Sequence, residues 1–238
     1  MGLDDRKRLH IGLLIFDLDG TLIDSETDLA LSVNATRERF GLSPLSTPVI
    51  ASYVGQGVSI LVRRSLQGEV PEEGIENAIV FFKSYYRRHM LDHTVAYPGV
   101  LEALDALSGR TLAVLTNKPV NFSRGILEGL GMLSRFSFVY GGDSFDRKKP
   151  DPVGVLRMME DTGRNATETL MVGDSDVDIE TGRSAGVWCC GVRYGIGSKS
   201  LPNAGPDFMV DNLRDLPPLI DRQPGVTSRG ACDGEAGS

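Results

Sequence analysis

The sequence lacks any long apolar run. The longest apolar stretch near its start, residues 11–16, is far shorter than the roughly 18 residues that a membrane-spanning helix requires, and it leads into acidic residues. Residues 1–10 carry charges of both signs and no long apolar core follows them, which argues against a secretory signal. We therefore expect a cytoplasmic protein that has no membrane partner.

Basic residues are also too few to dominate the charge. Lys and Arg number 25 against 32 Asp and Glu, and the net charge is −7. Nucleic-acid backbones are bound by basic surfaces, so we expect no nucleic-acid partner. A small anionic substrate remains compatible with this charge, because a bound cation and a few basic side chains can reverse the local field.

Cysteine is scarce, with three residues in the chain: Cys189, Cys190 and Cys232. Their positions show no metal-ligand spacing, and neighbours in sequence rarely form a disulfide with each other. We expect Cys189 and Cys190 to be buried strand residues of a reduced protein.

Short apolar runs that alternate with helical patterns predict an α/β fold. The expected strands are 11–16, 111–115, 136–139, 169–172, 187–192 and 207–210, and the expected helices are 121–129, 153–162, 177–185 and 212–220. Such alternation is typical of a Rossmann-like parallel sheet with helices on both faces.

The block 25–93 contains no convincing strand. Ser25 followed by Asp28 resembles a helix cap, and apolar residues then recur at helical spacing up to Gly41. A second helix is indicated from Pro71, with an apolar face that ends at Tyr86. We predict a helical cap domain at 25–93, inserted after the first strand of a core made of 1–24 and 94–222. A disordered tail is expected at 223–238.

Two acids follow the first expected strand. Asp17 and Asp19 lie two residues apart at a strand end, so their side chains point roughly the same way, toward the edge where α/β sheets bind ligands. One carboxylate can attack phosphorus while the other exchanges protons with the leaving group and with water. The alternative is an acidic turn that only closes the strand, with Gly20 supplying a permissive backbone.

Three further strand ends or loops carry polar groups. Thr116 and Asn117 could hold phosphoryl oxygens, although they also suit an ordinary loop. A lysine of the Lys148–Lys149 pair could neutralise a nucleophile and a phosphate, or simply be solvated. Asp174 lies in an acidic loop that suits Mg²⁺ better than Ca²⁺ or Zn²⁺, with the first turn of a helix as the alternative explanation.

Together these loops resemble the haloacid dehalogenase superfamily of phosphatases. The motifs are Asp-Leu-Asp-Gly-Thr at 17–21, Thr-Asn-Lys-Pro at 116–119, Lys-Pro-Asp-Pro at 149–152 and Gly-Asp-Ser-Asp-Val-Asp at 173–178. The resemblance covers nearly the whole chain, from residue 11 to about 219. It implies a phosphatase or phosphomutase, because dehalogenases of this superfamily have no acid at the position of Asp19.

The resemblance also assigns roles to the loop residues. It makes Asp17 the nucleophile and Asp19 the general acid and base. Thr116 and the Asn117 backbone bind phosphate, and Lys149 rather than Lys148 steadies the charge.

The same resemblance implies a Mg²⁺ cofactor. The ligands would be Asp174, the Asp17 carboxylate and the main-chain carbonyl of Asp19. Asp178 would be a neighbouring group that orients Lys149 or a metal-bound water.

Within the superfamily, the chain resembles the bacterial phosphoglycolate phosphatases, with matching stretches at 53–57, 97–99 and 141–143. The resemblance places substrate contacts in the loop of Gly55 and Gln56, where the usual Asn is replaced by Gln56. A carboxylate beside the phosphate would need a cation from the cap, and Arg63 is the better candidate than Arg64, although both also suit a plain surface.

The expected function is hydrolysis of a small phosphorylated metabolite, 2-phosphoglycolate, through an aspartyl-phosphate. Two alternatives share the core: a pyrophosphatase and a sugar-phosphate phosphatase. A non-catalytic binding protein that retains the fold is the alternative from another class. The partner is a small-molecule phosphorylated substrate, and the chain would act as a monomer or homodimer.

Overall fold

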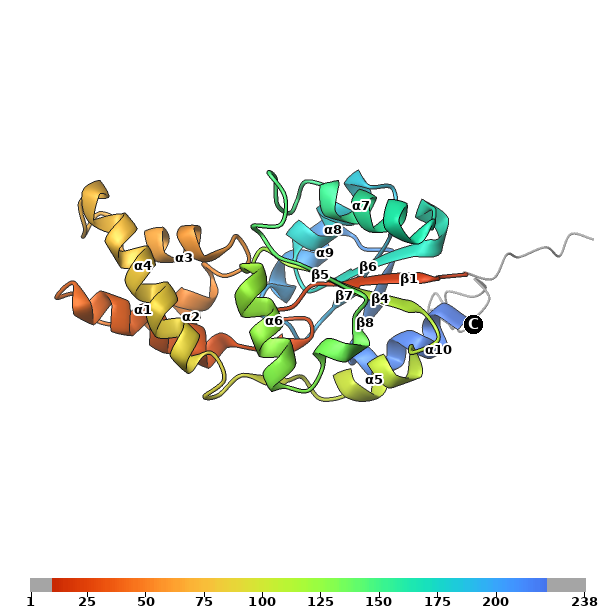
Figure 1. The fold of residues 1–238 in the computed structure, drawn as a ribbon, viewed down its shortest axis with the longest axis horizontal. Helices are drawn as coiled ribbons and strands as arrows, with labels where there is room; N and C mark the ends of the chain where they lie inside the picture. The colour runs from red at the N-terminus through yellow and green to blue at the C-terminus, as the bar shows by residue number, and fades with distance from the viewer. Residues whose placement is uncertain (1–9, 222–238) are drawn as a thin grey trace, which may run out of the picture.

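The computed structural model describes residues 10–221 of the chain. Its centre is a six-stranded sheet in the order β5-β4-β1-β6-β7-β8 (Figure 1). All of its neighbouring strands run parallel. The strands are β1 (Leu13–Phe16), β4 (Thr111–Leu115), β5 (Phe138–Tyr140), β6 (Thr169–Gly173), β7 (Trp188–Val192) and β8 (Phe208–Val210).

Strand β1 lies in the middle of the sheet, and all four of its residues are buried. Its last residue, Phe16, is in register with Val114 of β4 and Val172 of β6. Because the three strands are parallel and in register, the residues that follow them emerge at one edge of the sheet. This edge carries the motifs that the sequence singled out.

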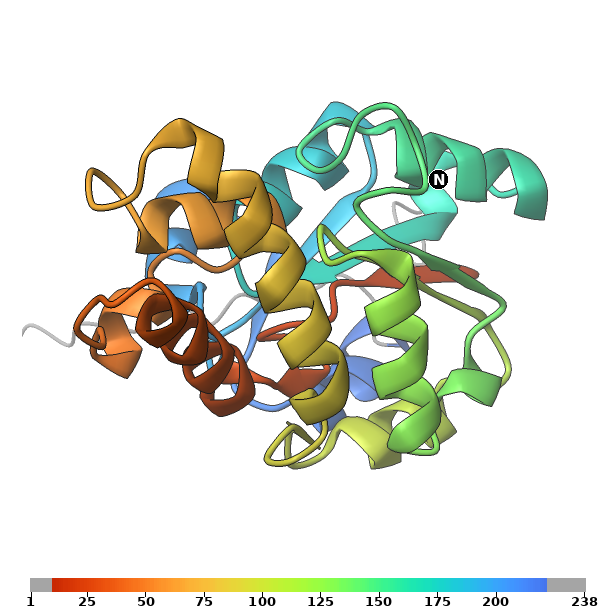
Figure 2. The ribbon, with the colours of Figure 1, turned by 60° about the vertical axis from the view of Figure 1, so that its left-hand side comes forward.

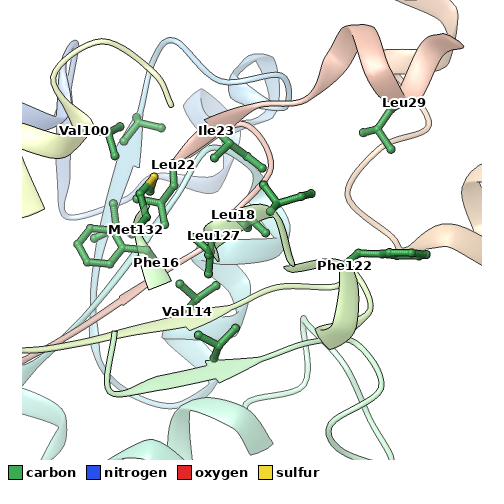
Figure 3. Packing of buried hydrophobic residues seen from close by; sticks show 14 of the residues in the cluster. Phe16, Leu18, Leu22, Ile23, Leu29, Val100, Val114, Phe122, Leu127 and Met132 are labelled. Carbon is green, nitrogen blue, oxygen red and sulfur yellow. The ribbon is translucent and has the colours of Figure 1, made fainter. Parts of the chain in front are cut away.

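Helices cover both faces of the sheet (Figure 1). Side chains alternate between the two faces, so Phe16 packs with Val114 and Leu127 on one face (Figure 3). Ile15 packs with Met158 on the other face. The covering helices are α5 (Val100–Ala106), α6 (Val120–Gly129) and α10 (Leu216–Asp221) on the first face, and α7 (Val153–Thr162) and α8 (Asp176–Ser184) on the second; α9 (Leu201–Ala204) packs beside α8.

Four α-helices lie beyond the sheet, in the part of the chain between two short strands (Figures 1 and 2). The strands β2 (Ile23–Asp24) and β3 (Val95–Ala96) pair antiparallel where the chain leaves the sheet and returns to it. We call the helices the four-helix segment: α1 (Glu26–Arg39), α2 (Thr47–Ala51), α3 (Val58–Ser65) and α4 (Glu72–His89). The division into a cap at 25–93 and a core at 1–24 and 94–222 stays a prediction.

Most of the expected elements are confirmed. The predicted α/β class with a mostly parallel sheet is correct, and the expected helix at 153–162 coincides with α7. The expectation did not include α5 or the β2–β3 pair, which are seven residues and two residues per strand long. Periodicity cannot identify elements of this length.

The expected cap of α1 was wrong. The Ser25 side chain makes no capping bond and instead donates to Asp19 Oδ1 at 2.5 Å. The Asp28 carboxylate accepts hydrogen bonds from the backbone N–H groups of His93 and Thr94, where the chain leaves the four-helix segment. The partner of Ser25 precedes the helix, and the partners of Asp28 lie 65 and 66 residues further along the chain, so the helix pattern indicates neither.

Cys189 and Cys190 are buried and unpaired on β7, as expected. Cys232 and the predicted disordered tail at 223–238 lie outside the described residues. Among the helices that the structure describes, none combines the length and apolar character needed to cross a membrane.

Candidate active site

The carboxyl edge of the sheet brings three acids together. Asp17 follows β1 and its backbone N–H donates to the Val172 carbonyl of β6 at 2.9 Å, which holds it beside the loop of Asp174. Asp178 lies in the first turn of α8, after the same loop. Each of these three buried carboxylates offers an oxygen within 4.8 Å of the others.

Lys149 is the cation of this cluster. Its Nζ lies 2.8 Å from Asp17 Oδ1 and 2.5 Å from Asp178 Oδ1, and the residue is 5 % exposed. Burial would lower the pKa of Lys149, but the charges of the two carboxylates raise it above its ordinary value. Its neighbour Lys148 is exposed and donates to the Gln56 carbonyl, so Lys149 is the lysine that faces the acids.

The cluster carries more negative charge than Lys149 neutralises. Burial raises the pKa of Asp17 to about 6; the nearby Lys149 opposes this shift and Asp178 adds to it. Burial, followed by the charges of Asp178 and Asp17, raises the pKa of Asp174 well above the usual carboxyl range. Such acids are stabilised by a cation placed between them.

The donor set fits a hard divalent cation. Asp17 Oδ1 is buried and accepts no well-directed hydrogen bond from any described residue, although Lys149 is at ion-pair distance. Asp174 is partly satisfied, since its Oδ2 accepts from the Gly197 N–H at 2.7 Å and its Oδ1 accepts from the Thr21 hydroxyl at 3.3 Å. Carboxylate oxygens of this kind suit Mg²⁺ or Ca²⁺.

Two glycines let the loops approach so closely. Gly20 has φ +85°, and a Cβ built there would lie 2.2 Å from Asp174 Oδ2. A Cβ at Gly173 would lie 2.2 Å from the Asp178 side chain. Larger residues at these positions would push Asp174 or Asp178 away from the cluster, and at Gly20 would also strain the backbone.

Thr116 and Asn117 follow β4 at the same edge. Thr116 is buried, and its Oγ1 accepts from the Lys118 backbone N–H at 3.3 Å. The Asn117 side-chain amide donates to the Gly55 carbonyl at 2.9 Å and to the Lys149 carbonyl at 3.0 Å. Asn117 thus ties the sheet edge to both the four-helix segment and the lysine loop.

Asp19 is held by Lys118 and Ser25, neither of which the sequence pattern linked to it. Both of its carboxylate oxygens face Lys118 Nζ, at 2.6 and 2.9 Å, and Oδ1 also accepts from Ser25. The Lys118 ammonium lies 4.9 Å from the centre of the Tyr86 ring on α4. Lys118 belongs to the motif at 116–119, and its place in that motif could have identified it as a residue of the site.

A small pocket opens between the sheet edge and the four-helix segment. Its cavity volume is about 40 Å³. This is enough space for about three water molecules. Its lining comprises Asp17, Asp19, Leu29, Val54, Gly55, Gly57, Val58, Leu61, Tyr86, Thr116, Asn117 and Lys118.

Two of the expected substrate contacts point elsewhere in this conformation. Arg63 is outside the pocket lining and pairs with Glu72 at 2.5 Å, with 47 % of its side chain exposed. Gln56 is also outside the lining, and its side-chain carbonyl accepts from Arg64 at 2.8 Å. The structure therefore brings Gly55 to the pocket, but not Gln56 or Arg63.

Comparison with known proteins identifies the family. The model of the haloacid dehalogenase-like hydrolases matches residues 14–192. This chain belongs to the haloacid dehalogenase-like hydrolase family. The resemblance noted in the four loop motifs is thereby confirmed. Hydrolases of this family generally use a divalent metal, and the cluster of Asp17, Asp174 and Asp178 could bind one.

Relatives within the family share a name. Phosphoglycolate phosphatase of Chromobacterium violaceum is 38 % identical over 217 residues, which cover 89 % of this chain and 97 % of the relative. Phosphoglycolate phosphatase 1 of Pseudomonas aeruginosa is 36 % identical over 219 residues, covering 88 % and 80 %. A crystal structure of a predicted phosphoglycolate phosphatase from Haemophilus somnus is similar with a TM-score of 0.85, at 32 % identity and with 88 % and 98 % of the two chains covered.

Proposed function

We propose that this phosphoric monoester hydrolase depends on Mg²⁺ and converts 2-phosphoglycolate to glycolate and phosphate through an aspartyl-phosphate on Asp17. The observation that carries the proposal is the place of Asp17: it lines the pocket, and it also belongs to the acid cluster with Asp174. The relatives named phosphoglycolate phosphatase support the choice of substrate.

In the first step, a carboxylate oxygen of Asp17 attacks phosphorus and the ester P–O bond breaks. The bonding pair leaves with the glycolate oxygen, which takes a proton from Asp19. Lys149, at 2.8 Å from Asp17, keeps the nucleophile ionised and steadies the phosphoryl charge. The hydroxyl of Thr116 and the backbone of Asn117 hold the phosphoryl oxygens.

In the second step, water attacks the phosphorus of the aspartyl-phosphate. Asp19, now a carboxylate, accepts the proton of that water, and the bond between phosphorus and the Asp17 oxygen breaks to release phosphate. Lys118 and Ser25 hold the Asp19 side chain in place through both steps.

A Mg²⁺ ion would be held by Asp17, Asp174 and the Asp19 carbonyl, with Asp178 beside them. When bound, it supplies positive charge that offsets the repulsion between these acids and the phosphate. The need for such charge is supported by the raised pKa values of Asp17 and Asp174.

The four-helix segment would act as a cap that excludes water from the phosphoryl group. Two hydrogen bonds join it to the core loops next to the pocket: Asn117 donates to the Gly55 carbonyl, and Lys148 donates to the Gln56 carbonyl.

A substrate panel tests the proposal. With Mg²⁺ present, kcat/KM should be highest for 2-phosphoglycolate, at least about tenfold above glucose 6-phosphate and pyrophosphate, because one misplaced group in a small pocket costs about 1–3 kcal/mol. A higher kcat/KM for pyrophosphate or for the sugar phosphate would overturn the substrate assignment. It would leave the phosphatase chemistry in place.

A further inference from the structure

The ammonium group of Lys118 lines the pocket, and the mechanism leaves at least one of its N–H donors without a role. Lys118 is 5 % exposed and is the basic residue among those that line the pocket in the described chain. An ammonium has three N–H donors, and the two oxygens of Asp19 occupy at most two of them. Burial would lower the pKa of Lys118, but the charge of Asp19 and the neighbouring Tyr86 raise it, so the group stays charged.

The hydroxyl of Tyr86 is the second unused donor. Tyr86 is fully buried on α4, and its hydroxyl lies near the Lys118 ammonium, which cannot accept a hydrogen bond. The O–H group donates to no described residue. An unsatisfied buried hydroxyl is destabilising, and a phenylalanine would fill the same apolar face without that penalty. Burial raises the pKa of Tyr86 to about 12, so the hydroxyl keeps its proton near neutral pH.

Unsatisfied polar atoms concentrate at this pocket. Four buried side-chain atoms of the described chain lack a hydrogen-bond partner, and three of them belong to lining residues: Asp17 Oδ1, Tyr86 Oη and Asn117 Oδ1. Buried polar groups are otherwise nearly always satisfied in folded proteins, so this concentration marks the pocket as a place suited to a polar ligand.

We propose that Lys118 and Tyr86 together bind the carboxylate of the substrate while its phosphate lies at Asp17, so that this pair selects phosphorylated carboxylic acids. This inference rests on the proposed function and names the residues that give it its substrate class. A carboxylate accepts from an ammonium and from a hydroxyl at once. Without Lys118, the carboxylates of Asp17 and Asp19 would repel a second negative group in the same pocket.

The two donors come from different parts of the molecule. Lys118 is in the loop after β4, and Tyr86 is on α4 of the four-helix segment. A carboxylate bound by both residues therefore connects the loop after β4 to helix α4 of the four-helix segment. Phosphate esters without a carboxylate lose this link, and their turnover falls relative to that of an acid of the same size.

The experiment compares two substrates with the same two-carbon skeleton, 2-phosphoglycolate and 2-hydroxyethyl phosphate. The ratio of their kcat/KM values is measured for the wild type, Lys118→Met and Tyr86→Phe. Loss of a hydrogen bond to a charged group should lower this ratio about 10- to 100-fold in Lys118→Met and by about 3- to 10-fold in Tyr86→Phe. Arg63→Met is the matched control, and its ratio should equal that of the wild type.

The outcomes distinguish a failure of the carboxylate site from a failure of the proposed substrate. If both variants slow the two substrates by the same factor, Lys118 serves only Asp19 and the carboxylate site is overturned while phosphoglycolate remains the substrate. If the wild type does not prefer 2-phosphoglycolate over 2-hydroxyethyl phosphate, the proposed substrate fails and the site fails with it. Tyr86→Phe keeps the ring in the core, so it reports on the ratio even if Lys118→Met does not fold.

Discussion

The sheet edge and the four-helix segment contribute to the pocket in different ways. The edge supplies buried charges that contact one another, such as Lys149 between Asp17 and Asp178. The four-helix segment supplies mostly apolar wall, with Leu29 and Leu61 in the lining. This division implies that chemistry depends on the edge, while the choice of substrate depends on what the segment adds, above all Tyr86.

The two regions also differ in how firmly they are held. The edge residues follow hydrogen-bonded strands at the centre of the sheet. The four-helix segment joins the core through the short β2–β3 pair and through bonds such as that of Asn117 to Gly55. Substitutions at the edge should therefore abolish turnover, whereas those in the segment should change selectivity or stability.

The largest expected effect is at the nucleophile. Asp17→Asn should lower kcat about 10⁴-fold or more, because a neutral amide cannot form the aspartyl-phosphate. The measurement is steady-state hydrolysis of 2-phosphoglycolate, with circular dichroism to check the fold. Asp176→Asn is a matched control at an exposed acid of the same edge, and it should keep near wild-type activity. Substantial turnover by Asp17→Asn would remove Asp17 from the mechanism.

Removal of the metal should rank next. Treatment with EDTA should reduce hydrolysis about 10³-fold, because a bound cation supplies several kcal/mol of charge stabilisation, and added Mg²⁺ should restore it. Activity is followed before chelation, after chelation and after Mg²⁺ is returned. An enzyme that stays fully active after exhaustive chelation would show that the acids at the edge work without a cation.

The paired lysines compare the two regions directly. Lys149→Met leaves Asp17 and Asp178 buried without their cation, so we expect a loss of about 3–5 kcal/mol in the free energy of unfolding and loss of turnover. Lys148→Met, one residue away, removes an exposed ammonium that donates to Gln56 and should cost less than about 1 kcal/mol.

Urea unfolding of both lysine variants, with and without Mg²⁺, provides the measurement. Added Mg²⁺ should recover part of the stability of Lys149→Met, because the ion neutralises the same acids. Equal stability of the two variants would contradict the assignment of Lys149 as the cation of the cluster.

The edge was more predictable from sequence than the segment. Asp17 and Asp174 each follow a short buried run, and parallel strands bring such ends together, so their proximity follows from topology. Lys149 was selected over Lys148 by family position alone, since both suit a surface loop. The packed structure supplies the physical distinction, because Lys149 is buried and Lys148 is exposed.

Residues that bridge distant segments were harder to predict. Tyr86 was recognised as part of the apolar face of α4, but periodicity does not tell which buried ring carries a hydroxyl toward a pocket. Ser25 looked like a helix cap, yet it donates to Asp19 instead. In both cases the placement depends on how separate parts of the chain pack together, and a local pattern contains no information about that.

The smallest effect should be at the junction of the two regions. The buried Asp28 carboxylate on α1 accepts hydrogen bonds from the backbone of His93 and Thr94 and from the Thr94 hydroxyl. Burial by itself would raise the pKa of Asp28, but these bonds outweigh it and hold the pKa below its usual range. Asp28→Asn should therefore cost about 1–3 kcal/mol of unfolding free energy at neutral pH, with kcat changed only a few-fold.

A lowered folded-state pKa stabilises the protein fully above the unfolded value of about 3.9, and this stability is lost as the pH falls through the folded pKa. The Asp28 carboxylate also lies 2.9 Å from Nδ1 of the His93 ring. The difference in stability between wild type and Asp28→Asn should thus shrink as the pH falls below about 4. Thermal melts from neutral to acid pH measure it. Asp92→Asn removes a half-exposed partner of His89 and should be nearly neutral throughout. A difference between wild type and Asp28→Asn that persists unchanged at acid pH would mean that the Asp28 charge does not secure the junction.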